Sequence, residues 1–176
     1  MAKNIYMVGF MGVGKTTVGK IVAGKLNRKF VEMDEIIAKN EKMAIVDIFT
    51  QKGEPYFRMK ENDLLGDLSK KADLVVSCGG GLICNEDNAK VMKDTGVVFN
   101  LRATPQTIYA RTKQFKNRPL LNVDNPMEEI RKLLNQRAPH YAKTDYAIDT
   151  DDLSPQEVAS VIIDFVKKRT KFEGGS

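Results

Sequence analysis

Short hydrophobic runs alternate with longer amphipathic segments along this chain. The runs at residues 5–8, 30–34, 74–77, 97–101 and 146–148 have the length and composition of strands that are buried on both faces. The segments between them carry hydrophobic residues three and four positions apart, which is typical of helices that cover a sheet. Because the two kinds of segment alternate without a repeat or a linker, the pattern predicts an α/β fold. We expect a parallel five-stranded sheet flanked by helices, with ligands at the carboxyl ends of the strands.

The same pattern sets the limits of the predicted domain. A last amphipathic helix begins near Ser154, and we expect one domain over residues 1–170. Residues 113–125 are polar and rich in turn-forming residues between two predicted helices, so we expect a mobile lid there. Residues 171–176 are interpreted as a frayed tail or a remnant of an engineered extension.

A glycine-rich loop lies between the first predicted strand and the first helix. Its sequence over residues 9–16, GFMGVGKT, matches the phosphate-binding pattern G-x-x-x-x-G-K-[ST]. Glycines let successive N–H groups face inward, and the helix start adds the positive end of its dipole. Lys15 is expected at the β and γ phosphates as a catalytic residue, and the Thr16 hydroxyl is expected on Mg²⁺. The residues expected to contact a nucleotide are Gly12, Val13, Gly14, Lys15, Thr16 and Thr17.

Composition agrees with one compact domain. The chain has 176 residues, of which 42% are hydrophobic and 29% charged, enough for one core. No hydrophobic run approaches the length of a membrane span and the N-terminus does not resemble a secretory signal, so we expect a cytoplasmic protein without a membrane partner. Cys78, Cys84 and the distant His140 offer too few ligands for a zinc site, and we expect free thiols.

The net charge of +5 narrows the choice of partner. Basic residues are spread along the chain and are not clustered with aromatic residues. An anionic small-molecule substrate therefore explains the charge more simply than a nucleic acid does. We expect no nucleic-acid partner.

A second group of glycines follows the third predicted strand. Gly79, Gly80 and Gly81 expose backbone N–H groups and let a ligand approach closely, although an ordinary strand-to-helix turn is the alternative. The Asn-Lys-x-Asp motif of GTPases does not occur in the chain. Residues 63–66 match the D-x-x-G switch motif of GTPases, but the spacing of Leu64, Leu65 and Leu68 predicts that they lie inside an amphipathic helix. The combination favours a kinase over a GTPase.

Six motifs in order along the chain resemble those of the shikimate kinases. The first is the P-loop and the fourth is the group of three glycines. The other four are Glu32 and Asp34 after the second strand, Phe57, Arg58 and Glu61 in a helix, Arg118 to Leu121 in the lid, and Arg137, Pro139 and Tyr141 near the end of a later helix.

The resemblance implies a P-loop kinase fold of the nucleoside-monophosphate-kinase type. It implies transfer of the γ-phosphoryl group of ATP to the 3-hydroxyl of shikimate, on the route to aromatic amino acids, with ATP as co-substrate and Mg²⁺ as cofactor. Two alternatives stay open. One is a related small-molecule or nucleoside-monophosphate kinase. The other is a nucleotide-binding regulator without catalysis, which would be expected to have lost Lys15, Asp34 or Arg118. We expect a monomer.

Phosphoryl transfer depends on positioning, on cations and on a carboxylate that orients the acceptor hydroxyl. Asp34 is the candidate carboxylate, with helix N-capping as its alternative role. Arg58 and Arg137 extend apolar helical stripes, and a guanidinium pairs with a carboxylate in bidentate geometry. Glu61 lies three residues after Arg58 and is expected to orient it. The residues expected to bind shikimate are Asp34, Arg58, Gly79, Gly80, Gly81 and Arg137.

Two further arginines are expected to act on ATP. Arg118 lies in the lid and is expected to bind ATP and to stabilise the transition state after closure. Arg111 resembles the family position near adenine. For all four arginines, an exposed surface position is the alternative. The chain departs from the family pattern at Glu32, where an aspartate beside Mg²⁺ is usual, and at Phe115, Lys143 and Thr144. Ser77 offers a further water-mediated contact with Mg²⁺.

Overall fold

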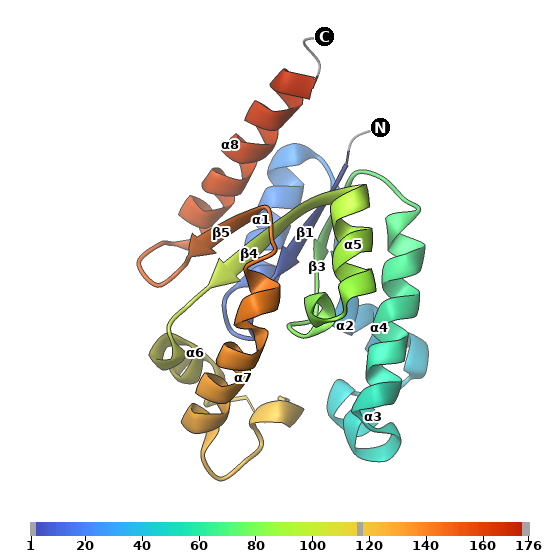
Figure 1. Cartoon of the computed structure of the whole chain (residues 1–176), viewed down its shortest axis with the longest axis vertical. Helices are drawn as coiled ribbons and strands as arrows, with labels where there is room; N and C mark the ends of the chain where they lie inside the picture. Colours follow the sequence, from blue (N-terminus) through green and yellow to red (C-terminus); the bar gives the residue numbers. More distant parts are fainter. Residues whose placement is uncertain (1–2, 116–117, 174–176) are drawn as a thin grey trace.

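Five parallel strands form one sheet in the order β2-β3-β1-β4-β5, in a computed structural model that describes residues 3–115 and 118–173 (Figure 1). Ile5 of the central strand lies opposite Val75 on one side and Val97 on the other. The predicted sheet is confirmed, including its parallel pairing. The strands are β1 (Asn4–Val8), β2 (Lys29–Glu32), β3 (Leu74–Ser77), β4 (Gly96–Arg102) and β5 (Tyr146–Asp149).

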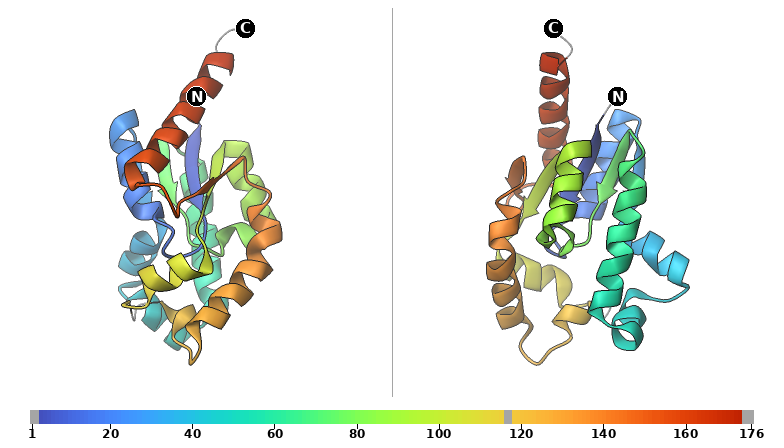
Figure 2. Two further views of the ribbon diagram at one scale, coloured as in Figure 1. Left: turned by 90° about the vertical axis from the view of Figure 1, so that its left-hand side faces the viewer. Right: turned by 45° about the vertical axis from the view of Figure 1, so that its right-hand side comes forward.

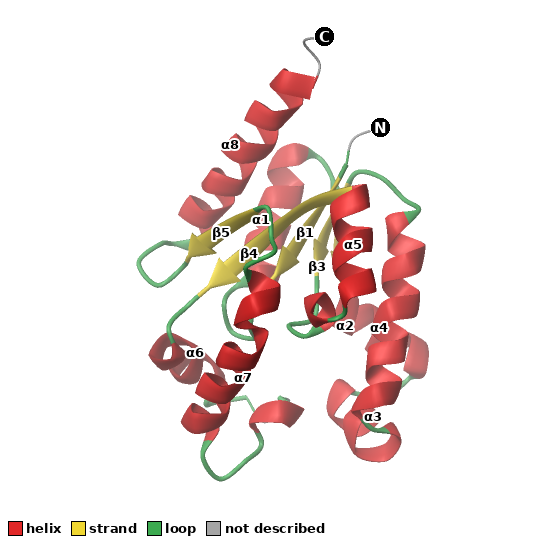
Figure 3. Ribbon diagram, in the orientation of Figure 1, coloured by secondary structure: helices red, strands yellow, loops and turns green. Residues whose placement is uncertain are grey.

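Helices fill the connections between the strands and cover both faces of the sheet (Figures 2 and 3). The α-helices are α1 (Lys15–Leu26), α2 (Met33–Glu41), α3 (Ile45–Lys52), α4 (Glu54–Ser69), α5 (Glu86–Thr95), α6 (Pro105–Thr112), α7 (Pro126–Tyr141) and α8 (Pro155–Glu173). Two short 3₁₀ helices are η1 (Leu82–Cys84) and η2 (Pro119–Leu121).

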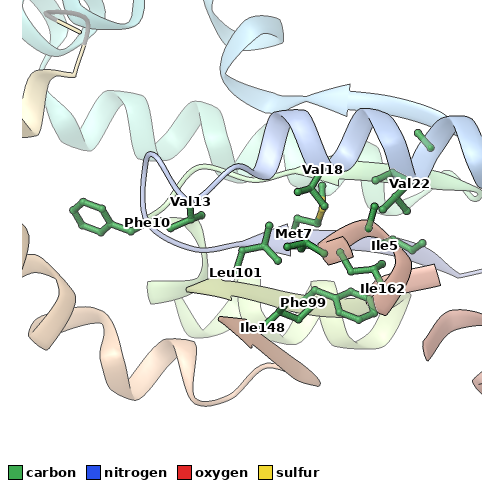
Figure 4. Close-up of a cluster of buried hydrophobic side chains, with 14 of the residues drawn as sticks. Ile5, Met7, Phe10, Val13, Val18, Val22, Phe99, Leu101, Ile148 and Ile162 are labelled. Atoms are coloured by element: carbon green, nitrogen blue, oxygen red, sulfur yellow. The ribbon is translucent and has the colours of Figure 1, made fainter. Parts of the chain in front are cut away.

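Alternate residues of the central strand face opposite sides of the sheet. Ile5 and Met7 belong to a core cluster with residues of α1 and α8 (Figure 4), whereas Tyr6 and Val8 belong to a cluster with residues of α4 and α5. A parallel strand covered on both faces has no polar side, which explains why its sequence is a continuous hydrophobic run. A third cluster joins α2, α3 and α4 beside the sheet.

The second strand ends earlier than its sequence predicts. β2 stops at Glu32, and Met33 begins α2, so Asp34 lies in the first turn of a helix and does not close a strand. The N-cap residue of α2 is Glu32, so Asp34 is not the N-cap either. Asp34 and Glu35 in the first turn interact favourably with the helix dipole, which supports this early helix start.

The lid and the last helix lie where the sequence places them, with two differences in detail. The predicted lid joins α6 to α7 as expected. Its described part contains η2, which the sequence did not predict. Residues 116 and 117 of the lid lie outside the described residues. α8 continues to Glu173, three residues past the predicted domain boundary, and the rest of the predicted tail is not described. Across the described chain, no helix combines the length and hydrophobicity needed to cross a membrane.

The topology creates a crevice at the carboxyl ends of β1 and β3. The chain leaves β1 toward α1 on one face of the sheet, and it leaves β3 toward α5 on the other face, so the two loops separate there. The N–H of Cys78 donates to the carbonyl of Met7 at 2.9 Å and holds the starts of the two loops side by side. α2, α3, α6 and η2 surround this end, whereas α8 ends at the opposite end of the molecule (Figure 1).

Candidate active site

A cavity of about 620 Å³ occupies the crevice between the P-loop, the three-glycine loop, α2 to α4 and the lid. Twelve of the fourteen predicted site residues line it: Gly12, Gly14, Lys15, Thr16, Thr17, Asp34, Arg58, Gly79, Gly80, Gly81, Arg118 and Arg137. The side chain of Val13 is buried in the core instead. Arg111 also lies outside the lining, where it donates to the carbonyl of Gly12 at 3.1 Å.

The P-loop presents the start of α1 to this cavity. Gly14 is the N-cap residue of α1 with φ 99° and ψ 16°, a left-handed conformation that favours glycine. No side chain of a described residue caps the helix, and its first turn contains no acidic residue. The free N–H groups and the positive dipole end therefore form an anion site of the kind that binds phosphates.

Lys15 follows this N-cap and lies along the P-loop. Its Nζ donates to the carbonyls of Gly9 and Phe10 at 2.8 and 3.0 Å. Burial lowers the pKa of Lys15 to about 8, while the nearby carboxylates of Glu32 and Asp34 act in the opposite direction. The ammonium group thus lies in a poorly solvated position between the P-loop and two acidic side chains.

Oxygen ligands gather beside the start of α1. Thr16 Oγ1 donates to Glu32 Oε2 at 2.5 Å. Burial raises the pKa of Glu32, and the Thr16 hydrogen bond opposes this shift. Ser77 at the end of β3 is buried beside Glu32, and its hydroxyl also lowers the pKa of that carboxyl group. A hydroxyl and a carboxylate are hard oxygen ligands, the type that Mg²⁺ prefers.

Asp34 faces several cations in the same cavity. Its Oδ1 is buried and accepts no hydrogen bond from a described residue. Burial raises the pKa of Asp34, whereas Lys15, Arg118 and Arg58 lower it, in decreasing order of effect. A carboxylate oxygen with no partner beside cationic groups can accept a hydrogen bond from a substrate hydroxyl.

Arg58 is fixed on α4 by two glutamates. Its Nη1 donates to Glu61 Oε2 at 2.6 Å, and its Nη2 donates to Glu54 Oε1 at 2.9 Å. Glu61 is completely buried, and burial raises its pKa to about 7 although Arg58 opposes the shift. The predicted orienting contact between Glu61 and Arg58 is therefore present.

Each of the three glycines lies against one charged side chain. A Cβ atom at Gly79 would collide with the Glu61 carboxylate, and one at Gly81 would lie 2.7 Å from Arg58 Nη2. At Gly80 it would lie 3.0 Å from Arg137 Nη1. The three glycines therefore leave room for the charged groups of the site as well as exposing the backbone.

Arg137 reaches the cavity from α7, although Pro139 lies two residues further along the same helix. The side chain is buried, its guanidinium lies 5.3 Å from the centre of the Phe10 ring, and Nη1 has no hydrogen-bond partner among the described residues. Tyr141, one turn later, donates to the carbonyl of Gly80 at 2.6 Å. The end of α7 thus contacts both loops that border the crevice.

Arg118 immediately precedes η2 in the lid. It is half-buried, and its Nε is a buried donor without a described partner. Its positive charge acts on both Lys15 and Asp34, which places it near the two predicted catalytic residues. Three predicted catalytic residues from three distant segments therefore lie together.

Sequence reasoning gave no role to the apolar wall of the cavity, although Phe57, Pro119 and Leu120 lie in two of the family motifs. This wall contains Ile45, Val46 and Phe49 of α3, Phe57 of α4, and Pro119 and Leu120 of η2. The rings of Phe49 and Phe57 are 4.8 Å apart. No local signal identifies the three residues of α3, because hydrophobic residues on a short helix equally predict core packing.

The remaining singled-out residues lie outside the cavity, apart from Cys78. Cys78 and Cys84 are free, as predicted, and Cys78 is buried in the cavity wall. Phe115 is 56% exposed at the start of the lid. Lys143 Nζ donates to Glu86 Oε1 at 2.6 Å, and His140 Nδ1 lies 3.8 Å from the same oxygen.

Comparison with known proteins agrees with this geometry. The model of the shikimate kinase family matches residues 11–167. The chain is 48% identical over 161 residues to a shikimate kinase of Thermodesulfovibrio yellowstonii, covering 92% of this chain and 93% of the relative. It is 44% identical over 167 residues to one of a Sulfurihydrogenibium species, covering 95% and 99%. A structure of shikimate kinase from Acinetobacter baumannii in complex with shikimate superposes with a TM-score of 0.92 at 36% identity, covering 96% of this chain and 95% of that one.

Proposed function

This chain belongs to the shikimate kinase family, and on that premise we propose that its cavity transfers the γ-phosphoryl group of ATP to the 3-hydroxyl of shikimate. The single observation that carries the proposal is the convergence of Lys15, Asp34 and Arg118 in one cavity that Arg58 and Arg137 also line. The first three suit phosphoryl transfer, and the other two suit an acceptor that carries a carboxylate.

ATP is assigned to the P-loop side of the cavity. The unpaired N–H groups at the start of α1 bind the phosphates, and Lys15 neutralises charge on the transferring group. Arg111 lies beside the P-loop and donates to Gly12, outside the cavity lining. Its position supports a contact with the base of the nucleotide rather than with the reacting phosphate.

Shikimate is assigned to the side formed by α4, α7 and the three glycines. Arg58 and Arg137 supply guanidinium groups for its carboxylate, and the rings of Phe49 and Phe57 offer an apolar surface for its carbon ring. Asp34 accepts the hydrogen bond of the reacting hydroxyl and takes its proton as the hydroxyl oxygen bonds to the γ-phosphorus. The bond from that phosphorus to the bridging oxygen of the β-phosphate breaks, and ADP leaves. In this arrangement the acceptor lies between its anchor and the phosphate site.

Mg²⁺ is assigned to Thr16, whose hydroxyl lies beside the phosphate site. Mg²⁺ keeps most of its waters and takes few protein ligands besides substrate phosphates, so a hydroxyl with Glu32 and Ser77 nearby fits its requirements. Glu32 is one methylene longer than the usual aspartate and already hydrogen-bonds Thr16. When bound, the ion supplies positive charge to the β and γ phosphates.

Arg118 adds positive charge from the lid. Its unpaired Nε and its position near Lys15 and Asp34 support a contact with the transferring group that forms on lid closure.

We also propose that the chain is a single domain, a monomer and a cytoplasmic protein. These points rest on the hydrophobic pattern and the composition of the chain and are separate from the chemistry of the cavity.

An acceptor panel tests the proposal. ADP release is measured with ATP and Mg²⁺ against shikimate, gluconate and a set of nucleoside monophosphates. Of these acceptors we expect only shikimate to support ADP release, and EDTA should abolish that activity. Turnover with gluconate or a nucleotide and none with shikimate would favour the alternative of a related small-molecule kinase. A folded protein that binds ATP but phosphorylates no acceptor would favour a regulator.

A further inference from the structure

A second cavity, of about 520 Å³, lies between α7 and the part of the sheet formed by β4 and β5. Residues 100–103 and 144–147 form one side, and Leu134, Ala138 and Tyr141 form the other. Phe10 and Val13 complete the lining, and Figure 4 shows both on the P-loop. The two cavities share no lining residue, so the second one is separate from the proposed ATP and shikimate sites. Its volume is within the range of small-molecule sites.

The charged groups of this cavity already have partners. The guanidinium of Arg102 donates twice to the carboxylate of Asp149, at 2.9 Å in both cases. Asp145 Oδ2 accepts from the N–H of Val98 at 2.8 Å, and Asp145 Oδ1 lies 3.6 Å from Arg169. A charged ligand would lose its hydration without meeting a free opposite charge. The cavity therefore favours an uncharged ligand.

One polar group in the wall lacks a partner. Asn100 of β4 is 2% exposed, and its Oδ1 is buried without a hydrogen bond from any described residue. A buried carbonyl oxygen without a donor is costly, so native structures usually satisfy it. An N–H or O–H group of a ligand in the cavity would supply the missing donor. The lining also contains the uncharged polar side chains of Asn135 and Thr144, but most of its residues are aliphatic or aromatic, including Leu134, Ala138 and Tyr141.

We propose that this cavity is a second ligand site, which takes an uncharged planar ring compound and directs one N–H or O–H donor of that compound to Asn100 Oδ1. The paired charges exclude an ionic ligand, the aromatic and aliphatic walls fit a flat ring, and Asn100 sets the polar requirement.

An occupant would contact two side chains that support the shikimate site. The Phe10 ring lines the second cavity and lies 5.3 Å from the guanidinium of Arg137. Tyr141 lines the same cavity and donates to the carbonyl of Gly80 at 2.6 Å. Both contacts connect the second cavity to groups that line the first.

Indole and 1-methylindole provide matched probes. Both are uncharged planar rings, but only indole has an N–H donor. Titration of the ¹⁵N-labelled full chain with each probe is followed by NMR, without any substrate. We expect saturable shifts at residues 100–103 and around Ala138, with indole binding about threefold to tenfold more tightly than 1-methylindole. Asn100→Leu, which removes the acceptor at similar volume, should abolish that difference.

A cavity-filling variant provides a second test that holds even if Asn100→Leu does not fold. Ala138 lines the cavity and is exposed, so Ala138→Trp should fold and should eliminate indole binding. The control is Ala72→Trp, at an exposed alanine that does not line the cavity, and it should bind indole as the wild type does. Shifts confined to the first cavity, no saturable binding, or equal affinity for the two probes would overturn the proposal. None of these outcomes depends on kinase activity, so failure here is distinguishable from failure of the proposed function.

Discussion

Burial governs the charges at the centre of this site. Lys15, Asp34 and Glu61 are all removed from water, which favours their neutral forms, and each has an opposite charge nearby that favours the ionised form. Removing one of these charged side chains deprives its buried neighbours of the opposite charge that stabilises their ionised forms. Substitutions here should therefore affect chemistry and stability in ways that depend on the partner that remains.

Lys15→Ala tests the phosphate assignment. The variant should fold, but its turnover should fall by about two orders of magnitude or more because charge on the transferring phosphoryl group loses its counter-charge. Steady-state kcat and the circular dichroism spectrum are measured together, with Lys25→Ala as the control at an exposed lysine of the same helix. A folded Lys15→Ala variant that keeps most of its activity would refute the assignment.

Asp34→Asn tests the acceptor carboxylate. The amide keeps the size of the side chain but loses the charge and the ability to take a proton, so transfer should be suppressed while ATP still binds. Calorimetry with each substrate and single-turnover kinetics separate the two effects. Loss of ATP binding with shikimate binding retained would instead assign Asp34 to the nucleotide.

Glu61 should make stability depend on pH. Its pKa in the folded protein, about 7, is above its ordinary value of 4.5, so the folded state binds this proton more tightly than the unfolded chain does. Its contribution is therefore fully present below pH 4.5 and is lost as the pH rises through 7. Relative to Glu61→Gln, the wild type should lose on the order of 1–3 kcal/mol of unfolding free energy between pH 5 and pH 8.

Urea denaturation of both proteins across that pH range measures the difference. Asp63→Asn on the same helix is the control, because Asp63 is exposed and lies away from the cavity. A difference between wild type and Glu61→Gln that does not change with pH would show that Glu61 has the same pKa in both states.

At the scale of elements, the site combines a rigid helix with a connecting segment. α4 holds Arg58 between Glu54 and Glu61, and the buried hydrophobic residues of this helix belong to two of the core clusters. Arg118 lies between α6 and α7 next to a single turn of 3₁₀ helix. A group on a packed helix contacts a ligand in the ground state and the transition state alike, whereas a group on a closing segment makes its contact later in the reaction.

This contrast predicts different kinetics for two arginine variants. Arg58→Ala should raise the shikimate KM on the order of 10- to 100-fold, with the ATP KM nearly unchanged and kcat lowered only modestly. Arg118→Ala should lower kcat on the order of 100-fold with a smaller effect on shikimate binding. Each substrate is varied in turn, and Arg131→Ala on the exposed side of α7 is the control. The reverse pattern would mean that the anchor and the catalytic group had been exchanged.

At the scale of the whole molecule, topology brings the site together. The P-loop and the three-glycine loop follow neighbouring parallel strands, β1 and β3, and leave the sheet toward opposite faces. The separation of these loops opens the crevice, and α2 to α4 and the lid complete its walls. Residues more than 100 positions apart, such as Lys15 and Arg137, therefore line one cavity.

The surface predicts a monomer. The large hydrophobic side chains that are exposed on the described part of the chain belong to α4, the lid, β5 and the loop before α8, and include Met59, Val123 and Leu153. Such a distribution offers no single extensive apolar face. Light scattering after gel filtration should give a mass near 19.7 kDa. A mass of twice that value, stable on dilution, would contradict the prediction.

Local pattern along the chain is enough to predict the strands and much of the chemistry. Buried parallel strands require continuous hydrophobic runs, so all five strands were predictable from local pattern. The P-loop was predictable because its glycines, its lysine and the helix that follows are contiguous. The pairing of Arg58 with Glu61 was predictable for the same reason, since helical spacing alone brings the two side chains together.

Features that depend on contacts between distant segments emerge only in the folded protein. Tertiary packing ended β2 before Asp34 and placed that carboxylate in a helix, among cations from the P-loop, α4 and the lid. It also set Phe49 and Phe57 in the cavity wall, left Arg111 outside the lining, and opened the second cavity beside Asn100. Hydrophobic pattern specifies which face of an element is buried but not what that face meets, because packing partners are chosen only when the whole chain folds.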